Sequence, residues 1–209
     1  MIAPFSCPII TALITSTGAL TCNDMIPPVF PDLPLMRNGE ILEHNPDQDY
    51  LTQKFTQESL SFIEKNKDEP FFLYLAHSMP HRQCHASPEF IKRYKESQLK
   101  KIEAGGDKES RDFLYPASVE ELDWSTGEIL KKIKTLGIEE NTLVIFTSDN
   151  GSKVGSARPL KGQKGCAFEG GHRVPAIMQW KGNIPAGSVS KEVVTGMDFL
   201  PTFASIAGA

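Results

Sequence analysis

A carboxylate and a carboxamide stand side by side in the segment 148–151, whose sequence is Ser-Asp-Asn-Gly. The segment directly follows the apolar run 142–147, and in open α/β sheets ligands gather at the carboxyl ends of strands. Asp149 and Asn150 would offer hard oxygen donors to a metal ion there, while Gly151 lets the backbone turn sharply. An ordinary Asx-Gly turn is the alternative, and this segment taken alone favours the turn.

A second candidate for chemistry is the segment 158–175, which contains four glycines and several basic side chains, Lys161 and Lys164 among them. Glycines let a backbone approach an anionic group closely, and ammonium groups would neutralise its charge. A solvated basic loop is the alternative, and composition alone does not exclude it. The segment therefore predicts either an anion-binding loop or an exposed basic loop.

Three apolar runs predict the strands that would position these groups. Residues 71–76 and 142–147 are expected as short strands buried on both faces, and residues 175–180 as a third short strand. The loops between them are predicted to be irregular: a Pro-rich connection over 24–48 and a polar surface excursion over 81–117.

Helices are predicted between these strands. Residues 49–65 place Leu51, Phe55 and Phe62 on one helical face, and residues 198–207 predict a short distal helix. The alternation of helices and strands indicates an α/β fold, with helices packed on the faces of a mostly parallel sheet.

The strongest helix signal covers residues 118–136. Ser118 is the expected N-cap, with Glu121 three residues later in a capping-box arrangement, and Gly137 is the expected stop. The apolar stripe of this helix consists of Val119, Leu122, Ile129, Ile133 and Leu136.

Composition excludes several classes of protein. The chain has 209 residues, 40% of them hydrophobic, which suits one globular domain or a large piece of one. Its net charge of −4 comes from mixed charges without a basic stripe, which argues against a nucleic-acid partner. The cysteines show no Cys-x-x-Cys pair and no zinc-like spacing; they are Cys7, Cys22, Cys84 and Cys166.

The N-terminal residues 1–21 form an atypical apolar segment. No Lys or Arg occurs before Arg37, whereas a signal peptide would start with a basic region. Polar residues interrupt the apolar run, so a membrane span is less expected than a signal peptide, which stays open as an alternative. The segment is interpreted as a buried stretch or as a start that is not native to the domain.

Several motifs, taken in order, resemble the arylsulfatase family of the alkaline-phosphatase-like superfamily. The resemblance covers residues 22–209, which would be the central and distal part of a sulfatase catalytic domain. Its motifs are Cys22-Asn-Asp-Met25, Pro70-Phe-Phe-Leu-Tyr-Leu-Ala76, Pro80-His81, Leu143-Val-Ile-Phe-Thr-Ser-Asp-Asn-Gly151, Lys164-Gly-Cys-Ala-Phe-Glu-Gly-Gly-His-Arg-Val-Pro175 and Met197-Asp-Phe-Leu-Pro-Thr202. The resemblance implies an alkaline-phosphatase-like sandwich, present here as an incomplete domain.

The resemblance also implies a reaction and its residues. The family hydrolyses sulfate esters at a Ca²⁺ site, and Asp149 and Asn150 match two of the metal ligands. Lys164 and His81 match residues that contact the sulfate; Lys161 is the rival of Lys164, but the spacing to the Glu-Gly-Gly motif favours Lys164. His85, like His77, is interpreted as a surface or packing histidine.

Three family features are missing from these 209 residues. The family carries a formylglycine made from the cysteine of a Cys-x-Pro-Ser-Arg motif, and no such motif occurs here; the echo at Cys7-Pro8 is attributed to chance. An acidic Asp-Asp pair and a Gly-Lys-x-His block are missing too. We therefore expect the chain by itself to bind Ca²⁺ weakly and to hydrolyse no sulfate ester.

Two functional hypotheses follow from the sequence, with a third, weaker rival. The first is a fragment of a calcium-dependent sulfatase that acts on a sulfated small molecule, lipid or glycan; the second is a non-catalytic relative that binds an anionic ligand or partner. A phosphoesterase of the same broader fold is disfavoured by the Lys-Gly-x-x-x-Glu-Gly-Gly block. By resemblance, the expected compartment is secretory, lysosomal or periplasmic. The sequence does not specify an oligomeric state.

Overall fold

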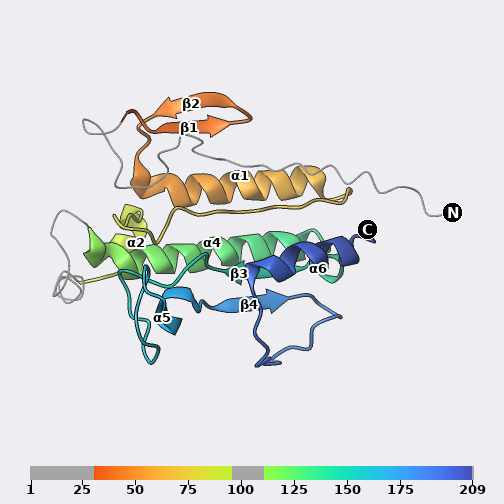
Figure 1. The fold of residues 1–209 in the computed structure, drawn as a ribbon. Helices are drawn as coiled ribbons and strands as arrows, with labels where there is room; N and C mark the ends of the chain where they lie inside the picture. The colour runs from red at the N-terminus through yellow and green to blue at the C-terminus, as the bar shows by residue number, and fades with distance from the viewer. Residues whose placement is uncertain (1–30, 96–110, 209) are drawn as a thin grey trace.

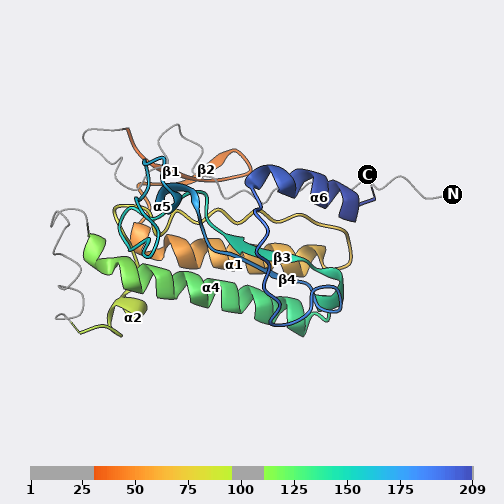
Figure 2. The ribbon, with the colours of Figure 1, turned by 60° about the horizontal axis from the view of Figure 1, so that its bottom comes forward.

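The computed structural model describes residues 31–95 and 111–208 (Figure 1). The predicted apolar segment 1–21 and the family-like motif at residues 22–25 lie outside these described parts. Two long helices, α1 (Leu51–Asn66) and α4 (Tyr115–Thr135), lie side by side in every view (Figures 1 and 2). No helix in the described parts is long and apolar enough to cross a membrane.

Helix α1 confirms the helix predicted over residues 49–65. It follows the short 3-10 turn η1 (Gln48–Tyr50), where the Asp47 carboxylate accepts a hydrogen bond from the Asp49 N–H at 3.0 Å. The predicted apolar face is buried, and Ile63 and Ile133 of α4 belong to one core cluster with Phe62. The two helices therefore form the main core.

Helix α4 begins three residues earlier than predicted, at Tyr115, directly after the 3-10 turn η4 (Asp112–Leu114). The predicted capping box is wrong, because the side chains of Ser118 and Glu121 bond to the backbone of the segment 85–87 and not to the N-terminus of α4. The Ser118 hydroxyl donates to the His85 carbonyl at 2.6 Å, and Glu121 accepts from the Ser87 N–H at 2.9 Å. The prediction at the other end is confirmed: Gly137 stops the helix with a left-handed φ of 70°.

The two distal strands lie where the apolar runs predict them. Strand β3 (Val144–Thr147) follows the turn η5 (Glu139–Asn141) and pairs with β4 (Ala176–Gln179). This pair is antiparallel, with Val144 opposite Gln179. The predicted burial of β3 on both faces is wrong, since two of its residues are half-buried and two are exposed. All four residues of β4 are exposed as well.

The predicted mostly parallel sheet is not found among the described residues, which form two antiparallel two-stranded sheets. Residues 71–76 account for part of this difference, because they belong to neither sheet. A strand needs a neighbour that exchanges N–H and C=O hydrogen bonds with it, and these residues have no such ladder in the described parts. The strand prediction for 71–76 is therefore wrong for this structure.

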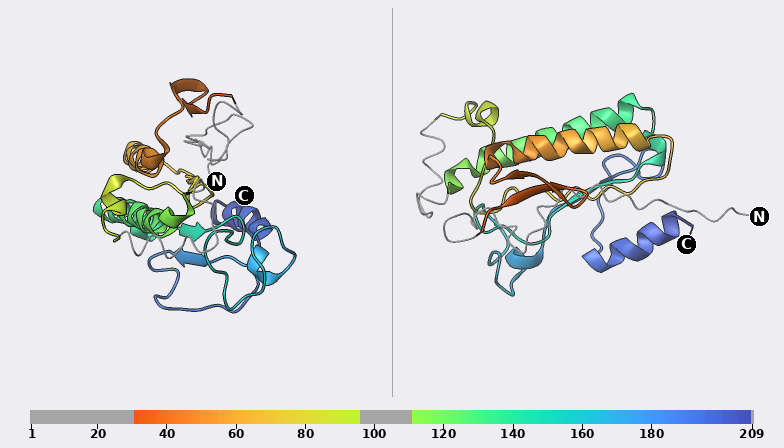
Figure 3. Two further views of the ribbon diagram at one scale, coloured as in Figure 1. Left: turned by 90° about the vertical axis from the view of Figure 1, so that its left-hand side faces the viewer. Right: turned by 90° about the horizontal axis from the view of Figure 1, so that it is seen from above.

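Residues 71–76 nevertheless contact helices on two sides. The Phe71 ring meets Phe62 of α1 edge-on at 5.7 Å, whereas the next ring, Phe72, contacts Phe203 of α6 (Phe199–Ile206) at 5.5 Å. Figures 2 and 3 show α6 on the opposite side of β3 from α1 and α4. Residues 71–76 therefore contact helices on two sides, whereas the predicted sheet with helices on both faces stays a prediction.

Helix α6 confirms the short helix predicted over 198–207. The 3-10 turn η6 (Gly196–Asp198) leads into it, and the Asp198 carboxylate accepts from the Thr195 N–H at 2.7 Å in a capping box. None of the residues of α6 is buried.

The predicted irregular connection over 24–48 contains a hairpin instead. Strands β1 (Pro34–Arg37) and β2 (Glu40–His44) are antiparallel and joined by Asn38-Gly39, both with positive φ. An Asn-Gly pair with this backbone is the usual two-residue hairpin turn, so the dipeptide was the missed signal. Leu35 of β1 joins the core with Leu51 and Phe55.

The predicted surface excursion over 81–117 is wrong for its first part. Cys84, Ala86 and Phe90 are almost inaccessible to solvent. Helix α2 (Pro88–Ile91) places Phe90 against Trp124 of α4, with ring centroids 5.7 Å apart. The polar composition of the stretch conceals this buried segment, and its residues 96–110 are not described.

Candidate functional site

The carboxyl end of β3 carries the first pair of candidate residues, as the sequence predicts. Asp149 is exposed and Asn150 half-buried, directly after the last strand residue, Thr147. The Asn150 amide donates to the Asp149 carboxylate, and the Ser148 hydroxyl donates to the Asn150 carbonyl at 3.2 Å. The two side chains are therefore adjacent and open to a ligand.

Glycines hold the second candidate loop directly against this turn. The Gly151 N–H donates to the Gly171 carbonyl at 3.0 Å, and a Cβ on Gly151 would lie only 2.0 Å from the Gly170 carbonyl oxygen. A Cβ on Gly170 would lie 2.3 Å from the Gly162 oxygen. The backbones thus approach to distances that a side chain would forbid, and the short helix α5 (Glu169–His172) sits at this contact.

Lys164 lies in the loop that these glycines hold. Its N–H donates to the Ser152 carbonyl at 3.2 Å, which fixes its backbone two residues from Asn150. The rival Lys161 places its ammonium over the Phe168 ring, 4.0 Å from the centroid. The structure therefore gives the Lys161 side chain an aromatic partner, and the assignment of Lys164 to the sulfate stays a prediction.

The basic loop ends in a pair of charged residues that face each other. The guanidinium of Arg173 lies 3.8 Å from the Glu169 carboxylate, and both side chains are largely exposed. Their pairing spans the short helix α5.

His81 belongs to a turn that ties its ring to the next residue. The His81 N–H donates to the Ser78 carbonyl at 3.2 Å, and ring atom Nδ1 is hydrogen-bonded to the Arg82 carbonyl. Because a carbonyl only accepts, Nδ1 carries the proton and Nε2 is the ring atom left for a ligand. The guanidinium of Arg82 in turn lies 3.4 Å from the Asp112 carboxylate.

One apolar contact brings the turn of His81 and the loop after β3 together. Val154 packs against the cluster of Cys84 and Leu114. Burial, with Asp112 nearby, raises the pKa of the Cys84 thiol to about 12, so this cysteine is an inert packing residue. The candidate segments thus share one end of the molecule, although no hydrogen bond or ion pair among the described residues links His81 or Lys164 to Asp149.

The metal site predicted at Asp149 and Asn150 fits Ca²⁺ in donor chemistry, because both side chains offer hard oxygens. The described residues contain no group of three or more His, Cys, Asp or Glu side chains that could hold a metal. Ca²⁺ takes about six to eight oxygen ligands. Asp149 and Asn150 can therefore supply only part of a calcium site.

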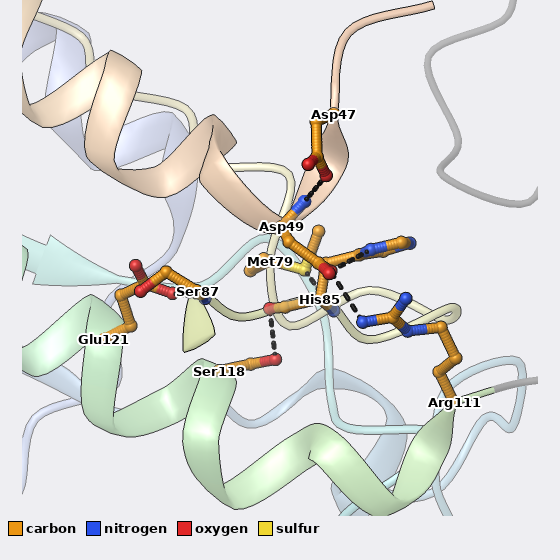
Figure 4. Close-up of polar contacts among 8 residues, drawn as sticks. All are labelled: Asp47, Asp49, Met79, His85, Ser87, Arg111, Ser118 and Glu121. Carbon is orange, nitrogen blue, oxygen red and sulfur yellow. Dashed lines mark hydrogen bonds and ion pairs between the residues drawn. The ribbon is translucent and has the colours of Figure 1, made fainter. Parts of the chain in front are cut away.

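The structure adds a half-buried cluster of Asp49, His85 and Arg111 that the sequence did not predict (Figure 4). One carboxylate oxygen of Asp49 accepts from His85 Nδ1 at 2.7 Å and from the Arg111 guanidinium at 2.6 Å. Burial alone would raise the pKa of the Asp49 carboxyl. The hydrogen bonds from His85 and Arg111, with the charge of Arg111, outweigh burial and hold this pKa below its usual value. No sequence signal could have found the cluster, since His85 and Arg111 lie 36 and 62 residues from Asp49.

His77 is a packing histidine, as expected. Its Nε2 lies 3.1 Å from the Ser125 hydroxyl of α4, and its ring is 6.2 Å from that of Phe55. Burial lowers its pKa to about 4, so the ring is neutral at physiological pH.

Comparisons with known proteins point to one family. A family model described as Sulfatase matches residues 18–209. Steryl-sulfatase of Homo sapiens is 37% identical over 186 residues, which are 84% of this chain and 29% of that protein. N-acetylgalactosamine-6-sulfatase of Canis lupus familiaris is 40% identical over 167 residues, 76% of this chain and 29% of that protein. An arylsulfatase of Hemicentrotus pulcherrimus is 32% identical over 202 residues, 92% and 34% of the two chains.

Solved structures agree with the sequence relatives. Ps i-CgsB in complex with k-i-k-neocarrahexaose superimposes with a TM-score of 0.66 at 34% identity, over 84% of this chain and 37% of that one. The PsFucS1 sulfatase from Pseudoalteromonas sp. gives a TM-score of 0.63 at 28% identity, over 83% and 34% of the chains. The 209 residues thus span 29% to 34% of the length of the three curated relatives named above.

Proposed function

The chain belongs to the sulfatase family of the alkaline-phosphatase-like superfamily, and we propose on that basis that it supplies part of a calcium-dependent site for sulfate-ester hydrolysis. The observation that supports this most is the contact of the glycine-rich loop with the turn after β3. There the backbone of Lys164 bonds to Ser152, two residues from Asn150.

Each candidate residue has a defined task in this proposal. Asp149 and Asn150 would contribute two oxygen ligands to Ca²⁺, which when bound neutralises charge on the sulfate oxygens. Lys164 would place an ammonium on the sulfate. His81 would donate from Nε2 when its ring is protonated, because Nδ1 is engaged by the Arg82 carbonyl.

The reaction also needs a nucleophile that these residues do not provide. The family uses formylglycine, and the Cys-x-Pro-Ser-Arg motif that yields it does not occur in the 209 residues. We therefore expect the chain by itself to bind sulfate and, weakly, Ca²⁺, and to leave aryl sulfates intact. Robust turnover of an aryl sulfate by the purified chain would contradict this expectation.

The substrate class proposed is a sulfated small molecule, lipid or glycan. The relatives include a steryl-sulfatase and an N-acetylgalactosamine-6-sulfatase, and one structural neighbour was solved in complex with k-i-k-neocarrahexaose. By the same family resemblance we place the function in a secretory, lysosomal or periplasmic compartment.

Titration calorimetry of the full chain with inorganic sulfate tests the proposal. Lys164→Ala and His81→Ala should each weaken sulfate binding by roughly 10-fold to 100-fold, since a hydrogen bond to a charged group is worth about 1.5–3 kcal/mol. Lys161→Ala should leave the affinity unchanged, because its ammonium lies on the Phe168 ring. The exposed Lys191 provides a matched control as Lys191→Ala.

Calcium is tested separately by competition with a fluorescent chelator. Asp149→Ala should abolish the weak Ca²⁺ binding of the chain, because it removes the only carboxylate of the pair. The proposal fails if Lys164→Ala and His81→Ala bind sulfate like the unmodified chain. It also fails if Lys161→Ala is the single variant that loses sulfate binding.

A further inference from the structure

The segment 79–87 carries His81 and contains no regular helix or strand, so its shape depends on contacts from its side chains. The His85 N–H points back to the Met79 sulfur at 3.1 Å. This contact joins the two sides of the turn around His81. His85 therefore contributes to closing the turn, together with the bond from the His81 N–H to the Ser78 carbonyl.

His85 is held at its backbone N–H, its carbonyl and its ring (Figure 4). It is 9% exposed, its ring donates to Asp49 at 2.7 Å, and its carbonyl accepts from the Ser118 hydroxyl at 2.6 Å. Two residues later, Ser87 is held by Glu121 through its N–H. Hydrogen bonds thus hold residues 85–87 between η1, which precedes α1, and the helix α4.

Ion pairs hold both sides of the turn. On one side Arg82 pairs with Asp112 at 3.4 Å; on the other, Asp49 binds His85 and Arg111 through the same oxygen. Arg111 and Asp112 are consecutive residues, so both pairs converge at the entry to α4. The Arg82 carbonyl, which is hydrogen-bonded to the His81 ring, belongs to the stretch between the two paired residues Arg82 and His85.

We propose that Asp49 is a positioning residue for His81. By holding His85, Asp49 keeps the turn closed so that the Arg82 carbonyl accepts the Nδ1 proton of His81 and Nε2 faces outward. Partners that orient a functional histidine in this way determine its tautomer. The inference rests on the proposed function only in its last step, the contact between Nε2 and sulfate.

The charged groups around His85 are consistent with this role. Asp49 faces its ring from η1, Arg111 contacts the same carboxylate from the entry to α4, and Glu121 lies on α4 beside Ser87. Burial raises the pKa of Glu121, and the nearby Asp49 charge adds to this increase. Removal of the Asp49 carboxylate would leave the half-buried guanidinium of Arg111 without this ion-pair partner, and the His85 ring without its acceptor.

The test uses the full chain labelled with ¹⁵N-histidine and measured at pH 8. Long-range ¹H–¹⁵N spectra show which ring nitrogen of His81 carries the proton, with the signal assigned by His81→Gln. In the unmodified chain, His81 should be present only as the Nδ1–H tautomer. In Asp49→Ala, His81 should become a mixture of the Nδ1–H and Nε2–H tautomers. Asp49→Asn retains an acceptor oxygen and should restore the single form.

Control variants separate positioning from general destabilisation. Glu64→Ala removes an ion pair of α1, to Lys132 at 2.8 Å, and should leave the His81 spectrum unchanged. If Asp49→Ala does not fold, as judged by circular dichroism, His85→Phe takes its place, because it removes the ring hydrogen bond but keeps the backbone contact to Met79. A single Nδ1–H form of His81 in a folded Asp49→Ala or His85→Phe chain would overturn the inference.

Titration of sulfate into the same chains, after the pH is lowered until the spectra show both ring nitrogens of His81 protonated, separates the two proposals. If the His81 signals of the unmodified chain ignore sulfate, the proposed function fails at this residue. The change of tautomer in Asp49→Ala would in that case still support the positioning role.

Discussion

Two regions of this molecule are held together in different ways. The helical layer, made of α1 and α4, buries seven residues of α1 alone: Leu51, Thr52, Phe55, Thr56, Ser59, Phe62 and Ile63. The distal region, residues 144–208, buries none of the residues of β4 or α6 and leaves Ile177 and Leu200 mostly exposed. Most of the candidate site residues lie in this second region.

The difference indicates which forces act where. In the helical layer, side chains interlock and even buried polar groups pair, as when the Thr56 hydroxyl donates to Ser125 at 2.6 Å. In the distal region, the closest approaches are between glycine backbones, as at Gly151 and Gly171. We infer that the helical layer carries most of the stability, whereas the distal region carries the geometry of the candidate site.

The largest expected effect sharpens this comparison by truncating one isoleucine in each region. Ile63→Ala, at a site 1% exposed in the helical layer, should lower the free energy of unfolding by about 2–5 kcal/mol because it leaves a cavity. Ile177→Ala, at a site 63% exposed on β4, should change it by only about 0.5 kcal/mol. Urea unfolding followed by circular dichroism measures both, and equal losses would refute the division into two regions.

The buried His77, which contacts Ser125 of α4, should make the stability of the helical layer depend on pH. The pKa of His77 is lowered by burial from 6.5 to about 4. The unfolded chain therefore binds this proton first, so the free energy of unfolding should fall as the pH drops from about 6.5 to about 4. The loss should reach up to about 3 kcal/mol and level off below pH 4, where both states are protonated.

His77→Asn removes this titration and should flatten the dependence of stability on pH in that window. The exposed His44 provides the control, and His44→Asn should preserve the slope. Urea midpoints between pH 4 and pH 7.5 decide the matter. An unchanged slope in His77→Asn would show that the acid sensitivity arises elsewhere.

The third prediction addresses the distal region and has the smallest expected effect on global stability. Gly151→Ala places a Cβ against the Gly170 carbonyl and should cost about 1–3 kcal/mol, because backbone must move to admit it. Gly196→Ala meets nothing within 4 Å, and φ there is not positive, so it should be nearly neutral. Hydrogen exchange should show faster exchange of the Gly151 and Gly171 amides only in the first variant.

If Gly151→Ala instead lowered stability as much as Ile63→Ala, the comparison would break, because the distal loop would then be coupled to the main core. If it left hydrogen exchange unchanged, the loop would tolerate the extra carbon and the glycine contact would not determine its shape.

Local patterns predicted a substantial part of the fold. The helical period around Phe55 and Phe62 indicated α1, and the apolar runs located β3 and β4 to within two residues. Gly137 ended α4 as expected. These predictions succeed because period, apolar runs and glycine stops depend on residues close in sequence.

Other predictions failed where a distant partner overrides a local pattern. Ser118 and Glu121 have the spacing of a capping box, yet both bind the segment 85–87 instead. Residues 71–76 have the composition of a buried strand, but a strand exists only where a neighbour completes its hydrogen bonds. The Asn-Gly hairpin turn was locally visible and overlooked.

The sequence by itself determined the family, the order of the motifs and the identity of Asp149, Asn150, Lys164 and His81 as candidates, because these depend only on residue types and their spacing. Only the tertiary structure decided which groups meet. It packed the glycine loop on the turn after β3 and joined Asp49 to His85 and Arg111. The physical reason is that a contact across 36 or 62 residues depends on the path of the whole chain and not on any local preference.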